Sequence, residues 1–276
     1  MISVSFDETP EAVVERAAIH ELGVQSADVR QVVDLLERMG LGARIPELEW
    51  ERDFDWITAG DDRVTVIVSE RSGGLRYRVR PLADEPGTNV STSAAGLEEI
   101  ARAWIERLGR PTEPMRLERI TYLRAQTAVA GAAPSAATTL DAGLVFTRTV
   151  EDLPVIGPGG VAMVKIGTDE TVVGGREVWR PIVRSGVKLA LRGPGEAMDL
   201  LQSRLRKSGL DGEVHVRKAR QGYAELGIDQ RQRFLEPCYA FVIESGGGLV
   251  ESKKVEVIPA ARVGPMASAF ARGVSA

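Results

Sequence analysis

The segment "EDLPVIGPGGVAMVKI", residues 151–166, joins a glycine-rich turn to a run of small and branched apolar residues. A phosphate-binding loop needs a strand before its glycines, a helix whose N-terminus faces the anion after them, and usually a Lys-Ser or Lys-Thr pair. Residues 161–166 instead alternate in character as a strand does, and no lysine ends the loop. We therefore interpret residues 157–160 as a turn before a strand, which argues against a nucleotide-binding protein.

Outward from this turn, four segments have the apolar spacing of helices. The first spans residues 9–22, with Thr9 as its cap and Pro10 at its first position. The second runs from a cap at Ser26 to Gly40. The third covers residues 97–109 and the fourth residues 195–209, each ending at a glycine. These patterns predict four helices.

Each of the last three predicted helices is followed by strand-like residues and a hairpin. The predicted hairpins cover residues 63–79, 160–179 and 238–258, with glycine-rich or polar turns between alternating apolar residues. Strands that follow a single helix through tight turns favour an antiparallel sheet packed on that helix. The expected fold class is therefore α+β, with the plan of one helix and one antiparallel sheet repeated in tandem.

Two segments resemble a known family. The sequence "VFTRTVEDLPVIGPGGVAMVKIGTDETVVGGREVW" (145–179) resembles the central signature of PepSY and fungalysin/thermolysin-propeptide domains, although Asp152 stands where that family usually has glycine. The segment "LEPCYAF" (235–241) is similar to a motif before the final hairpin of extracytoplasmic regulators of Gram-positive two-component kinases. The resemblance covers roughly residues 93–260. It implies tandem cystatin-like rolls that inhibit, chaperone or regulate a partner, and it implies no catalytic residues.

Composition and charge divide the expected tandem units. Residues 1–86 hold 18 acidic and 10 basic side chains, a net charge of −8, whereas the remainder carries +4. A Pro-, Gly- and Ser/Thr-rich stretch at 83–96 coincides with this change. We expect an acidic α+β unit at 1–86, propeptide-like units at 93–192 and 193–262, and a tail at 263–276.

Composition also limits the possible functions. No apolar stretch approaches the roughly 18 residues that span a bilayer, and the acidic N-terminal stretch is unlike a signal peptide. The compartment stays open between the cytoplasm and the soluble part of an exported protein. Cys238 is the single cysteine and the histidines number two, so no zinc site of the usual ligands is expected. We expect a cofactor-free protein.

Few residues have the pattern of a reactive site. His20 falls late in the first predicted helix, and His215 lies between two valines of a predicted strand, facing solvent. Cys238 follows a proline at a strand start, where a free cysteine is typically a small buried apolar residue. A basic group has no interleaved stacking aromatics, which argues against nucleic acid; its members are Arg204, Arg206, Lys207, Arg217, Lys218 and Arg220.

The candidate binding residues are aromatic and cationic side chains at equivalent ends of the predicted strands. They are Arg148, Trp179, Arg180, Tyr223 and Tyr239. On a curved sheet such residues can line a concave face that holds a peptide or a small molecule. The sequence favours a non-catalytic binding or regulatory protein with a protein or peptide partner. The alternative is a small-molecule enzyme with its pocket inside an α+β roll.

Overall fold

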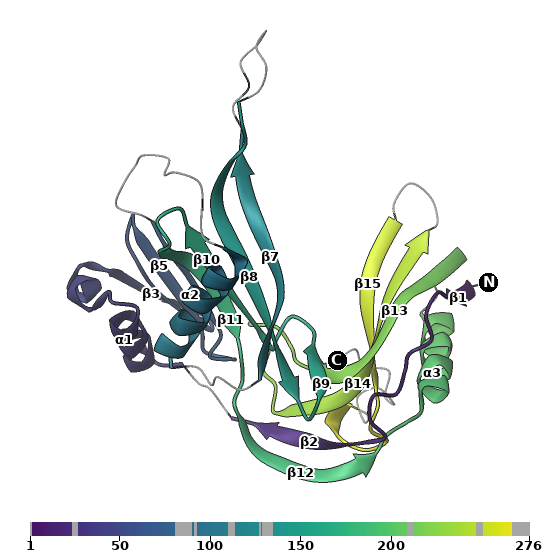
Figure 1. The fold of residues 1–276 in the computed structure, drawn as a ribbon. Helices are drawn as coiled ribbons and strands as arrows, with labels where there is room; N and C mark the ends of the chain where they lie inside the picture. The colour runs from purple at the N-terminus through teal and green to yellow at the C-terminus, as the bar shows by residue number, and fades with distance from the viewer. Residues whose placement is uncertain are drawn as a thin grey trace.

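The computed structural model describes residues 2–23, 27–80, 90, 93–109, 114–126, 128, 135–208, 212–246 and 251–266. These residues form three α-helices, one short 3-10 helix (Gly42–Glu47) and fifteen strands. Hydrogen-bonded pairing links all fifteen strands into one continuous system. In Figure 1 this system bends into a U, with two arms that rise from a base.

The first arm is an antiparallel sheet with one face covered by helices (Figure 1). Its strands follow one another in space as β3 (Glu49–Asp53), β4 (Trp56–Gly60), β5 (Val64–Ser69), β6 (Leu75–Val79), β11 (Val172–Val178), β10 (Val161–Gly167), β8 (Thr138–Val150) and β7 (Met115–Ala125). Because alternate side chains of a strand point to opposite faces, the buried apolar residues of β4, β5, β6, β8 and β10 pack under the helices. The residues that alternate with them face outward.

Local signals start both helices of this arm. In α1 (Val29–Arg38) Asp28 accepts a hydrogen bond from the Gln31 N–H, and the Gln31 side chain accepts one from the Asp28 N–H. This reciprocal pair satisfies two backbone donors that a helix start leaves free. The expected cap, Ser26, lies outside the described residues. In α2 (Ala94–Arg107) Ser93 caps the first turn.

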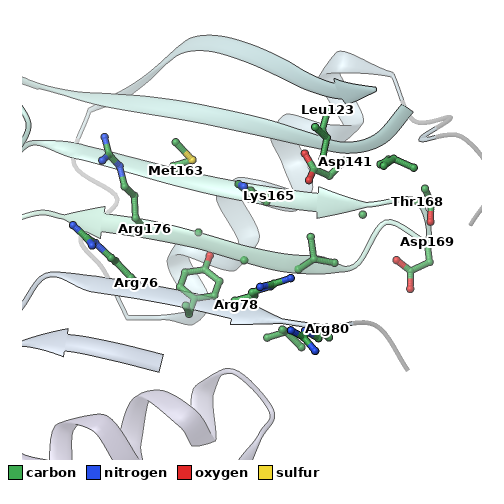
Figure 2. A pocket seen from close by; sticks show the side chains of 17 residues that line it. Arg76, Arg78, Arg80, Leu123, Asp141, Met163, Lys165, Thr168, Asp169 and Arg176 are labelled. Atoms are coloured by element: carbon green, nitrogen blue, oxygen red, sulfur yellow. The ribbon is translucent and has the colours of Figure 1, made fainter. Parts of the chain in front are cut away.

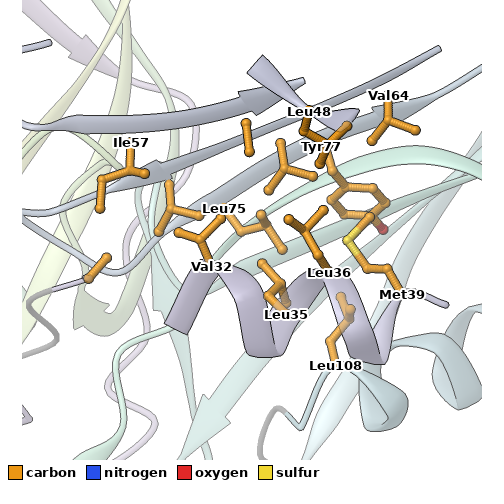
Figure 3. Close-up of a cluster of buried hydrophobic side chains, with 14 residues drawn as sticks. Val32, Leu35, Leu36, Met39, Leu48, Ile57, Val64, Leu75, Tyr77 and Leu108 are labelled. Atoms are coloured by element: carbon orange, nitrogen blue, oxygen red, sulfur yellow. The ribbon is translucent and has the colours of Figure 1, made fainter. Parts of the chain in front are cut away.

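Two apolar clusters lie between these helices and the sheet. Under α1, Val32 and Leu36 pack with buried residues of β4, β5 and β6, as Figure 3 shows for Ile57, Val64 and Leu75. Under α2, a second cluster joins Leu97, Ala101 and Ile105 to buried residues of β8 and β10. Burial of apolar surface at about 25 cal/mol per Å² is the main force that holds each helix on its strands.

The second arm combines strands from both ends of the chain (Figure 1). The strands are β1 (Ile2–Phe6), β13 (Gly212–Ala224), β14 (Phe234–Gly246) and β15 (Glu251–Pro259). The strand β1 pairs with β13 in parallel, whereas β13–β14 and β14–β15 are antiparallel. The helix α3 (Pro194–Lys207) covers one face through an apolar cluster that includes Leu201, Leu205 and Phe241.

Three further strands form the base and join the two arms. The strand β2 (Arg16–Leu22) pairs with β12 (Ile182–Ala190) and with the start of β14. The short strand β9 (Leu153–Ile156) pairs antiparallel with β8 of the first arm and parallel with β13 of the second. An apolar cluster around Leu22, Leu153 and Leu235 fills this junction.

This architecture corrects the expected fold class. We expected tandem cystatin-like rolls, each with its own helix on its own antiparallel sheet. The structure is one large mixed sheet system of fifteen strands, in which β6 pairs with β11 and two pairings of β13 are parallel. Apolar periodicity identifies individual strands but carries no information about pairing partners far away in the chain.

The first predicted helix is also wrong, because residues 16–22 form the strand β2. Both faces of this strand are covered, so that Ala17 and Ala18 are each buried. A strand buried on both faces loses the apolar-polar alternation that marks strands. The spacing of the apolar residues in this segment is also compatible with a helix, which explains the wrong prediction. The strands β1 and β2 pair with β13, β12 and β14, whereas the predicted unit 1–86 grouped residues 2–22 with residues 28–80.

The three predicted hairpins are confirmed as β5–β6, β10–β11 and β14–β15, each packed with the helix that precedes it. Residues 157–160 connect β9 to β10, and no helix follows them. Gly157 and Gly160 have φ angles of 119° and 64°, in the region that favours glycine. The interpretation of this stretch as a turn before a strand is therefore confirmed.

Candidate functional site

All five candidate binding residues are buried. The relative exposure of Arg148, Trp179, Arg180, Tyr223 and Tyr239 does not exceed 3% for any of them. In this structure they offer no surface to a partner, although we expected them to line a concave face. The structure brings three of them together and gives the two tyrosines separate roles.

Arg148, Trp179 and Arg180 meet around a buried carboxylate, Glu225, that the sequence analysis did not single out. The Arg180 guanidinium lies 3.2 Å from Glu225 Oε1, and Arg148 Nη1 lies 3.7 Å from Glu225 Oε2. Arg148 Nη1 also donates to the Arg180 carbonyl oxygen at 2.6 Å. The Arg148 guanidinium stands 5.6 Å from the centre of the Trp179 ring, within the range of a cation–π contact.

Arg180 fixes the connection between β13 and β14 through this cluster. Its guanidinium donates to the carbonyl oxygens of Leu226, Gly227 and Gln230. The Glu225 backbone in turn accepts from the Gly159 N–H, and a Cβ at Gly157 would lie 2.5 Å from the Glu225 carbonyl oxygen. The glycines of residues 157–160 are therefore needed for close approach to Glu225, not for an anion.

Burial dominates the electrostatics of this cluster. Loss of water raises the pKa of the Glu225 carboxyl group, and the positive charges of Arg148 and Arg180 oppose that rise. Burial also lowers the pKa of Arg180, against the attraction of Glu225. Burial of two cations and one carboxylate costs desolvation free energy, which only mutual pairing and many hydrogen bonds can offset. The cluster has the features of a structural junction between the arms.

The two tyrosines hold backbone segments in place. The Tyr223 hydroxyl donates to the Ala18 carbonyl oxygen at 3.0 Å and lies 3.1 Å from His20 Nε2. The other ring nitrogen of His20 lies 3.0 Å from the Ser185 hydroxyl. The Tyr239 hydroxyl donates to the carbonyl oxygen of Arg192.

The contact between His20 and Ser185 has the form of a base beside a nucleophile, but the surrounding structure does not favour a reaction. Ser185 is exposed on β12, in a stretch where the pairing with β2 is irregular. Neither residue lines the cavities of about 770, 740 and 180 Å³ in the described part of the chain. The expected helical position of His20 is wrong, because it lies buried on the strand β2.

The remaining reactive candidates are not positioned for chemistry. Cys238 is fully buried, and burial raises the pKa of its thiol to about 12. A thiol with such a pKa carries almost no nucleophilic thiolate at neutral pH. His215 is partly exposed between the buried Val214 and Val216 and contacts the Ser5 hydroxyl. Among the described residues, no three His, Cys, Asp or Glu side chains gather where they could hold a metal ion.

A cavity lies on the open face of the first arm, opposite the helices (Figure 2). We call it the basic groove and define it by the five cations that line it: Arg76, Arg78, Arg80, Lys165 and Arg176. Its volume is about 770 Å³. Met163 and Leu123 add apolar surface, and Asp141 and Asp169 lie toward one end. A smaller cavity of about 180 Å³ continues the groove past Arg76 and Arg176 toward Asp229.

Strand pairing sets the positions of these cations. Arg176 of β11 lies directly opposite Arg76 of β6, and Met163 of β10 lies opposite Arg176 on the other side. In the next row Gly174 lies between Lys165 and Arg78. Because glycine has no side chain, the floor of the groove is low at this point. Tyr77 belongs to the helix side, where its hydroxyl accepts a hydrogen bond from Trp104 Nε1 at 2.7 Å.

The groove cations have no carboxylate partner among the residues that the structure describes. In the described part of the chain, none of the five lies within 4.0 Å of an Asp or Glu oxygen, although ion pairs are frequent elsewhere on this surface. Arg76 instead stacks over the Trp56 ring at 5.7 Å. Like charges directly opposite one another on neighbouring strands destabilise a sheet. The pair of Arg76 and Arg176 therefore weakens the fold unless an anion is bound.

The basic groove was not predicted from the sequence, where a different basic group stood out. Arg204 and Arg217 of that group are paired, with Glu256 and with Asp7 and Glu244 respectively. The signal for the groove was present in "LRYRVR" (75–80), where arginine recurs at every second position. Such alternation places the arginines on one face of a strand, but only the folded structure shows that this face is open and that no described Asp or Glu pairs with these arginines.

The fold and the groove define a β-rich protein of mixed sheet topology with one open, basic sheet face. No protein-family model matches the chain, and no curated protein matches it. Among solved structures, the chain is similar to an uncharacterized protein from Eubacterium rectale ATCC 33656. The identity is 10%, the TM-score is 0.56, and the likeness covers 94% of this chain and 89% of that chain. At this identity the likeness concerns the fold alone.

None of the helices in the described parts of the chain is long and apolar enough to cross a bilayer.

Proposed function

We propose that this protein is a non-catalytic binding protein that engages an anionic segment of a partner protein in the basic groove. The observation that carries this proposal is the group of five exposed cations on one open sheet face, with no Asp or Glu oxygen of the described residues within ion-pair distance. Complementary charge speeds association and selects among partners more than it adds affinity.

The groove favours binding over catalysis. Its polar groups are mainly guanidinium groups, which stay charged and do not exchange protons at neutral pH. The Thr171 hydroxyl donates to Asp169 and is the main cause that lowers the pKa of that carboxyl group, which keeps it ionised. A general acid or base would instead need a pKa near the working pH. The alternative of a small-molecule enzyme therefore has no support from the described groove residues.

A charge-reversal experiment tests the proposal. The double variant Arg76→Glu/Arg176→Glu should reduce the affinity for a fluorescein-labelled, Glu-rich peptide by at least about tenfold, which corresponds to about 1.4 kcal/mol. The matched control is Arg206→Glu/Lys207→Glu, which changes net charge equally on exposed residues at the end of α3. Fluorescence anisotropy measures the affinity of both variants and of the wild type at low and at physiological salt. Screening by salt should weaken the wild-type interaction. Equal losses in the two variants would show a general charge effect and contradict the proposal.

A further inference from the structure

Three of the groove cations come from consecutive alternate positions of one chain segment. Arg76 and Arg78 lie on β6, and Arg80 follows directly after that strand. All three are exposed, and Figure 2 shows them in a row along the lower edge of the groove. Alternate residues of a strand are about 6.8 Å apart. The three guanidinium groups therefore form a row with this repeat.

We propose that the occupant of the basic groove is an extended polypeptide segment with Asp or Glu at every second position, lying along β6. This inference rests on the proposed function and specifies its ligand. Alternate side chains of an extended segment point to the same side with the same repeat of about 6.8 Å. Three successive carboxylates can thus face Arg76, Arg78 and Arg80 in turn, each in a charge-assisted hydrogen bond.

The rest of the groove fits a strand that lies on the open face. Stacked β-layers keep their strands within about 30° of each other, so a segment aligned with β6 also runs along β11 and β10. Arg176 and Lys165 then flank the row of carboxylates from the neighbouring strands. The absence of a side chain at Gly174 leaves room between Lys165 and Arg78. Met163 adds apolar surface on β10, on the far side of β11 from the row.

Two other anionic ligands fit less well. Single-stranded nucleic acid is held largely by bases stacked on exposed aromatic rings. Within the described lining of the groove the one aromatic residue is Tyr77, which is buried and hydrogen-bonded to Trp104. Inorganic phosphate would be satisfied by a single cluster of donors, whereas these cations extend in a row along a cavity of about 770 Å³.

The test compares two labelled octapeptides of equal composition, half Glu and half Thr. In one the residues alternate, so every Glu faces one side; in the other the Glu residues form one block, which places only half of them on that side. We expect the alternating peptide to bind the full-length protein about tenfold more tightly. The variant Arg78→Gln, which removes the middle charge of the row, should abolish most of this preference. Circular dichroism and thermal unfolding of that variant verify that it is folded.

The outcomes separate the two proposals. Equal binding of both peptides to the wild-type protein would overturn the alternating pattern and leave the basic groove as an anion site. Absence of binding by either peptide at low salt would contradict the proposed function itself. Displacement of the alternating peptide by a lower concentration of single-stranded oligonucleotide or of inorganic phosphate would assign the groove to that ligand and overturn the inference.

Discussion

Glu236 is a carboxyl group that the fold buries on β14, with a relative exposure of 4%. One oxygen accepts a hydrogen bond from the Met266 N–H at 2.7 Å. The other oxygen is buried without a hydrogen-bond partner among the described residues. Burial raises the pKa of Glu236 to about 7, against the opposing effect of the Met266 hydrogen bond.

This raised pKa predicts a pH-dependent stability. Between about pH 4.5 and pH 7 the folded state holds a proton on Glu236 that the unfolded state has released, so the free energy of unfolding falls as the pH rises. The slope approaches about 1.4 kcal/mol per pH unit within that window. The variant Glu236→Gln keeps the acceptor oxygen and removes the titration. It should match the wild type near pH 5 and be more stable at pH 8, by on the order of 2 kcal/mol.

Denaturant unfolding of both proteins from pH 5 to pH 8 measures this difference. If the free energy of unfolding of the variant keeps the wild-type dependence on pH, the dependence arises from another group. Unchanged peptide binding by the variant at pH 7 would show that Glu236 acts on stability and not on the basic groove.

At the scale of elements, the pairing of β6 with β11 produces the floor of the groove. Gly175 lies opposite Tyr77 in this pairing. A Cβ at Gly175 would lie 2.5 Å from the Tyr77 hydroxyl and 2.3 Å from the Met163 carbonyl oxygen. Glycine is therefore required here because two neighbouring strands and a tyrosine approach the β11 backbone closely.

We predict that Gly175→Ala destabilises the protein by about 1–3 kcal/mol, the usual range for an added group in a packed interior. The control is Gly195→Ala, in the first turn of α3, where an added Cβ meets no atom within 4 Å. That change should be neutral or stabilising by up to about 1 kcal/mol, because alanine favours helix more than glycine does. Thermal and denaturant unfolding compare the two. Equal stability of the variants would mean that β11 can move away from Tyr77.

The elements that the sequence predicted correctly are those that depend on neighbouring residues. The helices α2 and α3, the three hairpins and the turn at 157–160 follow from caps, glycines and alternation within short windows. The strand β2 could not be recognised because both of its faces are covered. The pairings β6–β11, β1–β13 and β9–β13 join residues far apart in the chain, and a local pattern does not specify them.

The candidate site was predictable only in part for the same reason. Arg148, Trp179 and Arg180 do come together, but in a buried cluster and not on the concave binding face that we expected from their positions at strand ends. Their burial depends on Glu225 and on the connection to β14, which arrive from another part of the chain. The row of arginines in "LRYRVR" was visible in the sequence, but a row of charges is functional only if the fold leaves it exposed and unpaired.

At the scale of the whole molecule, the cluster around Glu225 lies where the two arms meet. Arg148 belongs to β8 of the first arm, Arg180 follows β11, and Glu225 follows β13 of the second arm. The strand β9 pairs with both β8 and β13 at the same place. The arms are therefore joined by β9, which pairs with a strand of each arm, and by the buried network of charges around Glu225.

This arrangement predicts a large effect from one substitution. Glu225→Ala removes the carboxylate and leaves the Arg148 and Arg180 guanidinium groups near each other in a dry interior, without their counter-charge. Breaking a buried ion pair in this way costs about 3–5 kcal/mol. The control is Glu213→Ala, because Glu213 is exposed at the start of β13 and its side chain lies 3.6 Å from His215. Loss of such an exposed contact changes stability by at most about 1 kcal/mol.

Denaturant unfolding followed by tryptophan fluorescence is suited to this comparison, because Trp179 lies within the cluster and Trp50, Trp56 and Trp104 report on the rest of the first arm. We expect Glu225→Ala to lower the free energy of unfolding by at least about 3 kcal/mol and Glu213→Ala to leave it nearly unchanged. A Glu225→Gln variant should recover part of the loss, since its amide oxygen still accepts from the Arg180 N–H that Glu225 Oε1 satisfies. If Glu225→Ala were as stable as Glu213→Ala, the arms would be held together by apolar contacts alone, and the charged cluster would not serve as their junction.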